Sequence, residues 1–388
     1  MDGHSSRGLL RHFDDLQDPR MHRTRHHRLD DIIAIAILAV ICGAQGPTHI
    51  ADFARQKYPW LKTFLHLPNG VPSHDTFGRV LAMLNPQAFE RCLLKWISAL
   101  VEVTDQTALH IDGKTLRRSF DAASQCAAVH MISVWASKAE LTLAQISTDK
   151  KSNEITAIPK LLDLITLHGA VITIDAIGCQ RDIVQKIIKE GGDYILAVKD
   201  NQPTLHDEVK LLFDEAIPNR FEGMGYDFDE QTDKGHGRIE TRRVWVTREV
   251  DWLRQRGQWA ALRSVVCVES VRRLIDPAGG EPKQSTQRRY FISSLDHRQR
   301  DRGAAYFARM IRDHWSIENK LHWSLDVTFH EDACRLRSGH AAENFSRLCR
   351  LALNLLKQEK ASHLSLPRKR LRAAWDAQYA LKVLGLQN

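Results

Sequence analysis

The sequence predicts a mixed α/β protein with an all-α region at its N-terminus. Three observations support this prediction: residues 1–105 are dominated by helical patterns, short strands begin near residue 107, and amphipathic helices then alternate with further strands. A second group of strand patterns interrupts this alternation at about 216–300. We therefore expect a helical domain at 1–105, an α/β domain at 106–361 that contains the β insertion, and a basic, helical tail at 362–388.

The composition is typical of a soluble globular protein and favours a polyanionic partner. Hydrophobic residues make up 43% and charged residues 26% of the 388 residues, and the formal net charge is +8. The longest apolar run, residues 32–44, is shorter than the ~20 residues that a membrane span needs, and no signal-peptide pattern is visible. The seven cysteines form no CxxC pair, so neither a disulfide framework nor a structural zinc site is indicated. We expect a cytoplasmic protein without membrane contacts.

The N-terminal region contains several helix signals. Residues 32–44 read as a buried helix, Ser73 or Asp75 is suited to cap a second helix, and the pair Asn85–Pro86 is suited to start a third. Two helices joined by a short turn at 73–103 are compatible with a helix-turn-helix and equally with a small helical bundle. The basic segment 20–28 lacks the spacing of a metal site, so it is expected to face solvent or phosphate.

The α/β region begins with alternating strands and continues with helix–strand units. The order of elements is a strand at 107–112, a hairpin of strands at 131–137 and 140–148, a helix at 154–166, a strand at 171–175, a helix at 180–191 and a strand at 193–199. Right-handed crossovers would add the later strands parallel to the first, which is the order of a ribonuclease H-like fold with a mixed sheet. Further helices are expected at 204–215, 301–329 and 340–361. The insertion contains strands at 236–247, 263–273 and 288–295, with an exposed loop at 275–288.

Two aspartates stand at equivalent strand ends. Asp112 closes TALHID and Asp175 closes VITID. If the two strands are parallel neighbours, roughly 4.8 Å apart, both carboxylates emerge at the same edge of the sheet. Mutual repulsion would then raise one pKa unless a cation lay between them, and Mg²⁺ is the usual ligand of such oxygen donors. The alternative is that each aspartate only caps the turn after its strand.

A third acidic group is expected from the helix at 309–329. At helical spacing its polar residues fall four apart on one stripe, while Ile311, Trp315 and Leu321 are suited to seat the helix on the sheet. The stripe consists of His314, Glu318, His322 and Asp326. We expect Glu318 to supply a carboxylate oxygen and the two histidines to act in support. The alternatives are a solvated face, or a transition-metal site at Glu318 and His322.

Five segments resemble bacterial insertion-sequence transposases of the H-repeat-associated group. They are HIDGKTLRRSFD (110–121), TIDAIGCQRDI (173–183), DYILAVKDNQPTL (193–205), HGRIETRRVWV (236–246) and the long run that starts HWSIENKLHWSLDV (314–357). The resemblance spans nearly the whole chain. It implies a helical transposase-associated DNA-binding domain at 1–105, followed by a DDE catalytic domain of ribonuclease H-like fold.

The resemblance implies that Asp112, Asp175 and Glu318 form the catalytic and metal-binding triad. Two Mg²⁺ ions, with Mn²⁺ as a substitute, would support cleavage at the ends of the element and strand transfer into target DNA. The implied partners are double-stranded DNA, from the terminal repeats and the target, and further copies of this chain in a homodimer or larger assembly. The implied location is the bacterial cytoplasm, at the nucleoid. The superfamily pattern of Tyr and Arg before the glutamate and Lys after it is absent, since these positions hold Ile311, His314 and Leu325.

Basic residues lie beside the three acidic residues and in the insertion, where they are expected to neutralise DNA phosphates. They are Lys114, Arg117, Arg118, Arg181, Lys199, Arg238, Arg242, Arg243, Arg335 and Arg337. Trp315 and Trp323 are expected in the core rather than as platforms for bases. Three other functions remain open: a nuclease of the same fold without strand transfer, an inactive or domesticated DNA-binding protein, and a transition-metal protein that uses His314, Glu318 and His322.

Overall fold

The computed structural model describes residues 8–100, 107–120, 127–148, 154–235, 237–275, 283–299 and 301–386. The chain divides into two compact units. The first unit combines three segments, Met1–Glu102, Gly113–Ala157 and Glu318–Asn388. The second unit combines two, Val103–Asp112 and Ile158–Ile317.

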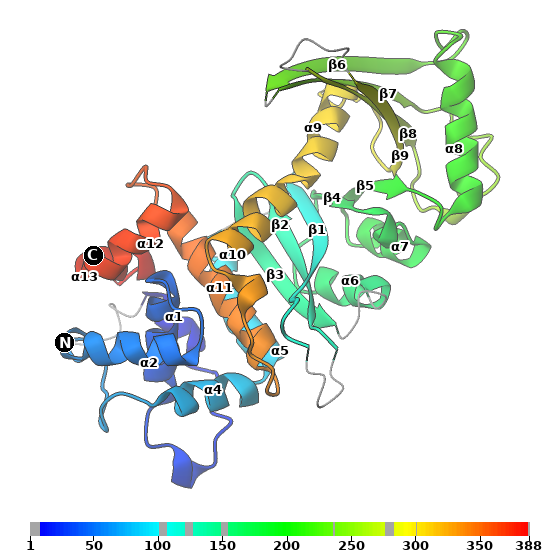
Figure 1. Cartoon of the computed structure of the whole chain (residues 1–388). Coiled ribbons are helices and arrows are strands. Elements are labelled where there is room, and N and C mark those ends of the chain that lie inside the picture. The colour runs from blue at the N-terminus through cyan, green and yellow to red at the C-terminus, as the bar shows by residue number, and fades with distance from the viewer. Residues whose placement is uncertain are drawn as a thin grey trace. The chain divides into compact units, whose positions relative to one another are not determined.

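The described helices agree with the predicted succession (Figure 1). The N-terminal region is helical as predicted and contains α1 (Leu29–Ile41), α2 (Pro47–Gln56), α3 (Tyr58–Leu61), α4 (His74–Met83) and α5 (Pro86–Ser98). The middle of the chain contains α6 (Glu154–Leu162), α7 (Arg181–Lys189), α8 (Pro203–Ala216) and α9 (Ala304–His314). The C-terminal part contains α10 (Trp323–Val327), α11 (Ala341–Gln358), α12 (Leu366–Trp375) and α13 (Ala377–Leu384).

Nine strands form a mixed sheet with the order β3-β2-β1-β4-β5-β9-β8-β7-β6. The first five are β1 (Ala108–Thr115), β2 (His130–Ala136), β3 (Leu141–Thr148), β4 (Val171–Ile174) and β5 (Asp193–Val198). The strands of the insertion are β6 (Tyr226–Gly235), β7 (Arg238–Thr247), β8 (Ser264–Leu274) and β9 (Gln284–Ser293). As predicted, β2 and β3 form an antiparallel hairpin, and β1, β4 and β5 are parallel neighbours. The insertion extends the same sheet, because β9 pairs antiparallel with β5.

Two details of the insertion differ from the prediction. Strand β6 was not predicted, because its side chains are mostly exposed at the sheet edge and its acidic sequence lacks apolar alternation. Strand β9 begins at Gln284, within the predicted loop at 275–288, because it continues the ladder with the end of β8. Residues 276–282 of that predicted loop lie outside the described residues.

In the first unit, the N-terminal helices pack around helix α11. The predicted buried helix is α1, whose residues from Asp31 to Ile41 are all buried. Ser73 caps α4 by accepting from the backbone of Thr76, and Asn85 caps α5 by accepting from Ala88, as predicted. Helix α11 contacts α1, α4 and α5, so residues far apart in the chain share one core.

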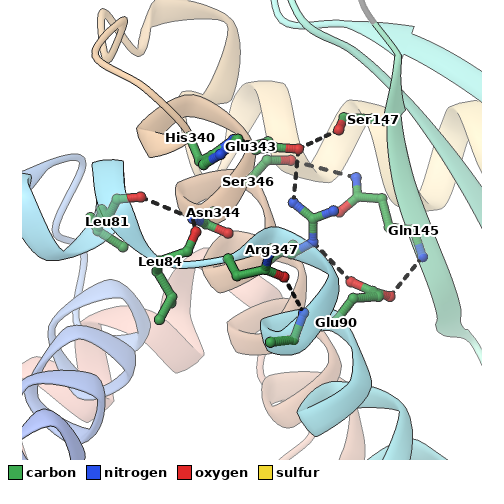
Figure 2. A network of polar contacts seen from close by, with 12 residues as sticks. Leu81, Leu84, Glu90, Gln145, Ser147, His340, Glu343, Asn344, Ser346 and Arg347 are labelled. Atoms are coloured by element: carbon green, nitrogen blue, oxygen red, sulfur yellow. Dashed lines mark hydrogen bonds and ion pairs between the residues drawn. The ribbon is translucent and has the colours of Figure 1, made fainter. Parts of the chain in front are cut away.

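A buried polar network crosses this core (Figure 2). The Glu90 carboxylate, 3% exposed, accepts hydrogen bonds from the Gln145 backbone and from the guanidinium groups of Arg347 and Arg350. Asn344 donates from α11 to the carbonyls of Leu81 and Leu84 at the end of α4. These bonds satisfy charges and backbone groups that water does not reach, which ties α4 and α5 to α11.

The C-terminal tail is helical, as predicted, but two of its basic residues are buried and donate hydrogen bonds within the first unit. Lys369 and Arg370 of α12 are buried. Lys369 donates to the carbonyl of Leu356, and Arg370 donates to that of Val40 while its guanidinium lies 4.2 Å from the Phe329 ring centroid. Among the described residues, no helix combines the length and apolarity that crossing a bilayer requires.

In the second unit, helices cover both faces of the sheet. Phe291 of β9 belongs to a buried cluster with Phe307 and Met310 of α9. The preceding residue, Tyr290, stacks with Phe213 of α8. Because successive strand side chains point to opposite faces, α9 and α8 lie on opposite sides of the sheet.

Candidate functional site

The two predicted aspartates occupy matching positions on neighbouring parallel strands. His110 pairs with Thr173 and Ile111 with Ile174, so the next residues in this register are Asp112 and Asp175. Side chains alternate along each strand, which places both aspartates on the face that also carries His110 and Thr173. This arrangement confirms that β1 and β4 are parallel neighbours and brings the two carboxyl groups to one edge of the sheet.

The environment of Asp175 keeps its carboxylate ionised. Its Oδ1 accepts a hydrogen bond of 2.7 Å from the backbone nitrogen of Ala176 and lies 3.3 Å from Nζ of Lys199. Partial burial raises the pKa of Asp175, but these two donors outweigh it, so the pKa lies below the ordinary value. The side chain is half exposed, so its oxygens remain accessible to a ligand. An accessible, ionised carboxylate with a second one at the matching position is the donor set that a hard divalent cation prefers.

Thr173, two residues before Asp175, contacts the rings of two histidines. The Thr173 hydroxyl lies 2.6 Å from Nδ1 of His110 and 2.8 Å from Nδ1 of His314, the last residue of α9. Burial lowers the pKa of His110 to about 3 and that of His314 to about 4. Both rings are therefore neutral at physiological pH. His314 was predicted to support the acidic residues, and it lies in the second unit with both aspartates.

A cavity of about 350 Å³ opens beside Asp175, and its lining includes cationic side chains together with Asp175 and Asp200. Its lining includes Lys199, His206, Arg288, Arg289, His314 and Trp315. The Arg289 guanidinium carbon lies 5.1 Å from the ring centroid of Trp315. Of the residues that line this cavity, the sequence analysis had named Asp175, Lys199 and His314 as functional. Arg288 and Arg289 were missed because they stand at the start of the predicted strand 288–295, and the sequence does not show which other strands lie beside it.

The prediction that Trp315 and Trp323 lie in the core is wrong. Trp315 is 41% exposed and Trp323 is 57% exposed. Each stands at a break in the helical structure, where the chain no longer follows the regular period on which the core prediction rested.

The predicted continuous helix at 309–329 is also broken. Helix α9 ends at His314, residues Ile317–His322 form a π-helical turn, and α10 follows. A π turn is wider than an α turn, so residues four apart no longer share one face. The predicted stripe of four polar residues is therefore wrong. Glu318 is exposed and lies on the π turn, in the first unit.

In the first unit, the residues that follow Asp112 are held by buried ion pairs. Nζ of Lys114 lies 2.6 Å from Asp326, 2.7 Å from Glu331 and 3.3 Å from Asp332. Burial alone would lower the pKa of Lys114, but the carboxylates raise it above the ordinary value. Burial and the neighbouring carboxylates, in turn, raise the pKa of Asp326. Lys114 was predicted to contact DNA, but its ammonium group is occupied by these three carboxylates.

Gly113 has a steric reason to be glycine. A Cβ atom at this position would collide with the side chains of His130 and Glu154, which form a buried pair. The other ring nitrogen of His130 lies 2.9 Å from the Thr115 hydroxyl. After Asp112, packing therefore requires glycine at position 113, and ion pairs hold the side chain of Lys114.

The arginines of the insertion form ion pairs within β7 and with its neighbouring strands. Arg242 lies between Asp233 and Glu240, and Arg243 lies between Glu230 and Glu269. Arg238 approaches Glu240 more loosely, at 3.9 Å. These contacts compensate the positive charges that were expected to meet DNA.

The remaining predicted DNA contacts are exposed. Arg181 donates to the side chain of Gln255, and Arg117 pairs with Asp332 while its side chain stays 80% exposed. Arg118, Arg335 and Arg337 are also exposed. Within the described ranges, no group of three or more His, Cys, Asp and Glu side chains is arranged to hold a metal ion.

Comparison with known proteins matches nearly the whole chain. Residues 101–355 match the family model "Transposase DDE domain", and residues 10–97 match the model "DDE_Tnp_1-associated". In Escherichia coli K12, the "H repeat-associated putative transposase YhhI" is 40% identical over 97% of each chain. In Escherichia coli O157:H7, the "Putative transposase YncI" is 38% identical over 98% of this chain and 95% of the relative.

Among solved structures, a piggyBac transposase synaptic complex with hairpin DNA is similar with a TM-score of 0.39 and 11% identity, over 98% of this chain and 77% of that chain. This similarity is too low to support an inference. The two family models and the full-length relatives suffice without it. They show that the chain belongs to the DDE transposase family, within the H-repeat-associated group that the sequence resembles.

Proposed function

We propose that this chain is an active transposase that cuts DNA at the ends of its element and joins those ends to target DNA. The observation that carries the proposal is the pair Asp112 and Asp175 at matching positions in the register of β1 and β4, with a cavity lined by cationic groups beside Asp175. We further propose a ribonuclease H-like catalytic domain, because the sheet order β3-β2-β1-β4-β5, with β1, β4 and β5 parallel, is the strand arrangement of that fold.

In this proposal, Asp112, Asp175 and Glu318 hold two Mg²⁺ ions, for which Mn²⁺ can substitute. Divalent ions supply activation of the attacking oxygen and charge stabilisation at the leaving oxygen. The carboxylates provide the oxygen ligands, and the bond from Ala176 orients Asp175. Lys199 and Arg289 then offset the negative charge of the DNA backbone that must approach these carboxylates. We propose that at least two copies of the chain act together on DNA, one for each end.

The direct test is to incubate the full-length protein with the DNA that flanks its own gene and to map the products. We expect cuts at the element ends with Mg²⁺ or Mn²⁺, DNA binding without cutting with Ca²⁺, and joined products when target DNA is added. Cuts without joined products would indicate a nuclease of the same fold. End binding without cuts under any of these ions would indicate an inactive DNA-binding protein.

Glu318 can be separated from His322 by two substitutions. Glu318→Gln keeps the shape but removes the charge, so we expect strand cleavage to fall by about 1,000-fold or more while end binding survives. His322→Gln should lower cleavage by about 10–100-fold at most, as is typical of groups that only support a ligand. Equal losses of activity and of bound transition metal would favour the transition-metal alternative. Normal cleavage by Glu318→Gln would remove Glu318 from the catalytic set.

The cavity arginine should contribute to DNA affinity through counterion release. We expect Arg289→Ala to reduce the slope of log affinity against log salt concentration by about 1, because one phosphate contact is lost. Arg256→Ala removes an equally charged group, half exposed and paired with Asp251 in the same unit, and serves as the matched control. Fluorescence anisotropy at several salt concentrations measures both. Identical slopes for the two variants would contradict a DNA contact at Arg289.

A further inference from the structure

The contact of one hydroxyl with two histidine rings restricts where their protons lie. The Thr173 hydroxyl bridges Nδ1 of His110 and Nδ1 of His314, and all three residues belong to the second unit. A hydroxyl has one proton and two lone pairs. If Thr173 accepted from both rings, its own buried proton would have no acceptor among the described residues, so we infer that it donates to one ring and accepts from the other. In this arrangement one histidine carries its proton on Nδ1, and the other carries it on Nε2.

The surroundings of His110 decide between the two arrangements. His110 is fully buried, and its Nε2 has no hydrogen-bond partner among the described residues. A buried N–H without an acceptor is costly, whereas an unpaired imidazole lone pair costs less. The favoured arrangement therefore has His110 donating from Nδ1 to Thr173, and Thr173 donating to Nδ1 of His314. His314 then carries its proton on Nε2.

We propose that His110 and Thr173 fix His314 as a neutral Nε2–H donor, which binds a phosphate oxygen of the DNA strand in the cavity beside Asp175. This inference rests on the proposed function. His314 lines that cavity together with Asp175, Lys199 and Arg289. His110 and Thr173 are positioning residues, since they act only through His314.

The neutral form has a chemical advantage next to the two aspartates. An imidazolium at His314 would pair with the Asp175 carboxylate and occupy lone pairs that a divalent cation needs. A neutral N–H donates to a phosphate oxygen without competing in this way. With Nδ1 accepting from Thr173 and Nε2 protonated, His314 also has no free lone pair, so it acts as a donor and not as a general base.

The tautomers are measurable without any reaction. In the full-length protein without metal, labelled with ¹⁵N in its histidine rings, we expect two-bond ¹⁵N–¹H spectra to show His314 as the Nε2–H form and His110 as the Nδ1–H form. His110→Gln and His314→Gln assign the two signals. Thr173→Ser should preserve both tautomers, and Thr173→Val should release them. A Nδ1–H form or an imidazolium at His314 at pH 7.5 would overturn the proposal.

Two pairs of variants test the role in cleavage. Glutamine places an amide N–H near the position of Nε2 and asparagine near that of Nδ1, so His314→Gln should retain more single-turnover cleavage than His314→Asn. Thr173→Val should lower that rate by about 10–100-fold with a much smaller loss of affinity for DNA ends, since one phosphate contact among many is weakened, and Thr173→Ser should restore the rate. Melting temperatures identify any variant that fails to fold.

Two outcomes of these assays remain distinct. Wild-type cleavage by Thr173→Val, or a more active His314→Asn, would contradict the donor role of His314 while leaving the proposed function intact. A wild-type protein that cuts no DNA would instead contradict the proposed function. In that case the ring-nitrogen spectra would still confirm or overturn the proton arrangement.

Discussion

Asp175→Asn should reduce Mg²⁺-dependent strand cleavage by about 1,000-fold or more, because it removes one charged oxygen ligand from the carboxylate pair. The substitution keeps the size of the side chain, and the amide oxygen can still accept from Ala176, so the fold should be retained. Binding to the element ends should be unchanged or slightly tighter, since a negative charge near the DNA phosphates is lost. Cleavage of a labelled DNA end and a gel-shift assay measure the two effects.

The matched control for this variant is Asp251→Asn. Asp251 is an exposed aspartate of the same unit, 89% accessible, and does not line the cavity. The Asp251→Asn variant should cleave DNA at the wild-type rate. Full activity of Asp175→Asn would refute the metal site at these strand ends, and a loss of DNA binding equal to the loss of cleavage would indicate a contact role instead.

The largest effect on stability is expected from Glu90→Gln. The substitution leaves the buried guanidinium groups of Arg347 and Arg350 without their counter-charge. Breaking a buried ion pair in this way typically costs about 3–5 kcal/mol. At about 2–4 °C per kcal/mol for a unit of this size, the melting temperature should fall by about 10 °C. Calorimetry or circular dichroism measures the shift.

Asp15→Asn provides a control for the same helix. Asp15 pairs with Lys95 of α5, but both side chains are more than half exposed. Exposed ion pairs contribute little, so the melting temperature should barely change. Equal shifts for the two variants would contradict the importance that we assign to the Glu90 network.

The sequence predicted the two parallel strands and their matching aspartates for a physical reason, although β1 continues past Asp112 to Thr115. In the sequence, both patterns alternate apolar residues on one face with polar residues on the other and close on an aspartate. This local pattern survives in the structure because both strands are central and buried. The strand β6 was missed because an exposed edge strand has no buried face to produce such a pattern.

The remaining differences arise where a residue's partner lies far away in the chain. In the sequence, Lys114 has the pattern of a surface charge. In the structure it pairs with carboxylates that follow it by more than 200 residues. Arg289 reads as part of a strand start, yet it reaches the cavity beside Asp175. The break after His314 changes the helical period, and nothing in a run of helix-forming residues announces a π turn.

The first unit is built from segments that are far apart in the chain, and this has a consequence for protein synthesis. Helices α1 to α5 leave the ribosome well before their buried partner α11 is translated. During this interval the second unit, whose segments end at Ile317, is completed before the N-terminal helices find their core. We therefore expect the apolar surface of these helices to stay exposed during this interval, as a site to which chaperones can bind. Proteins translated from gene copies with a frameshift before α11 should be degraded rather than persist as N-terminal fragments.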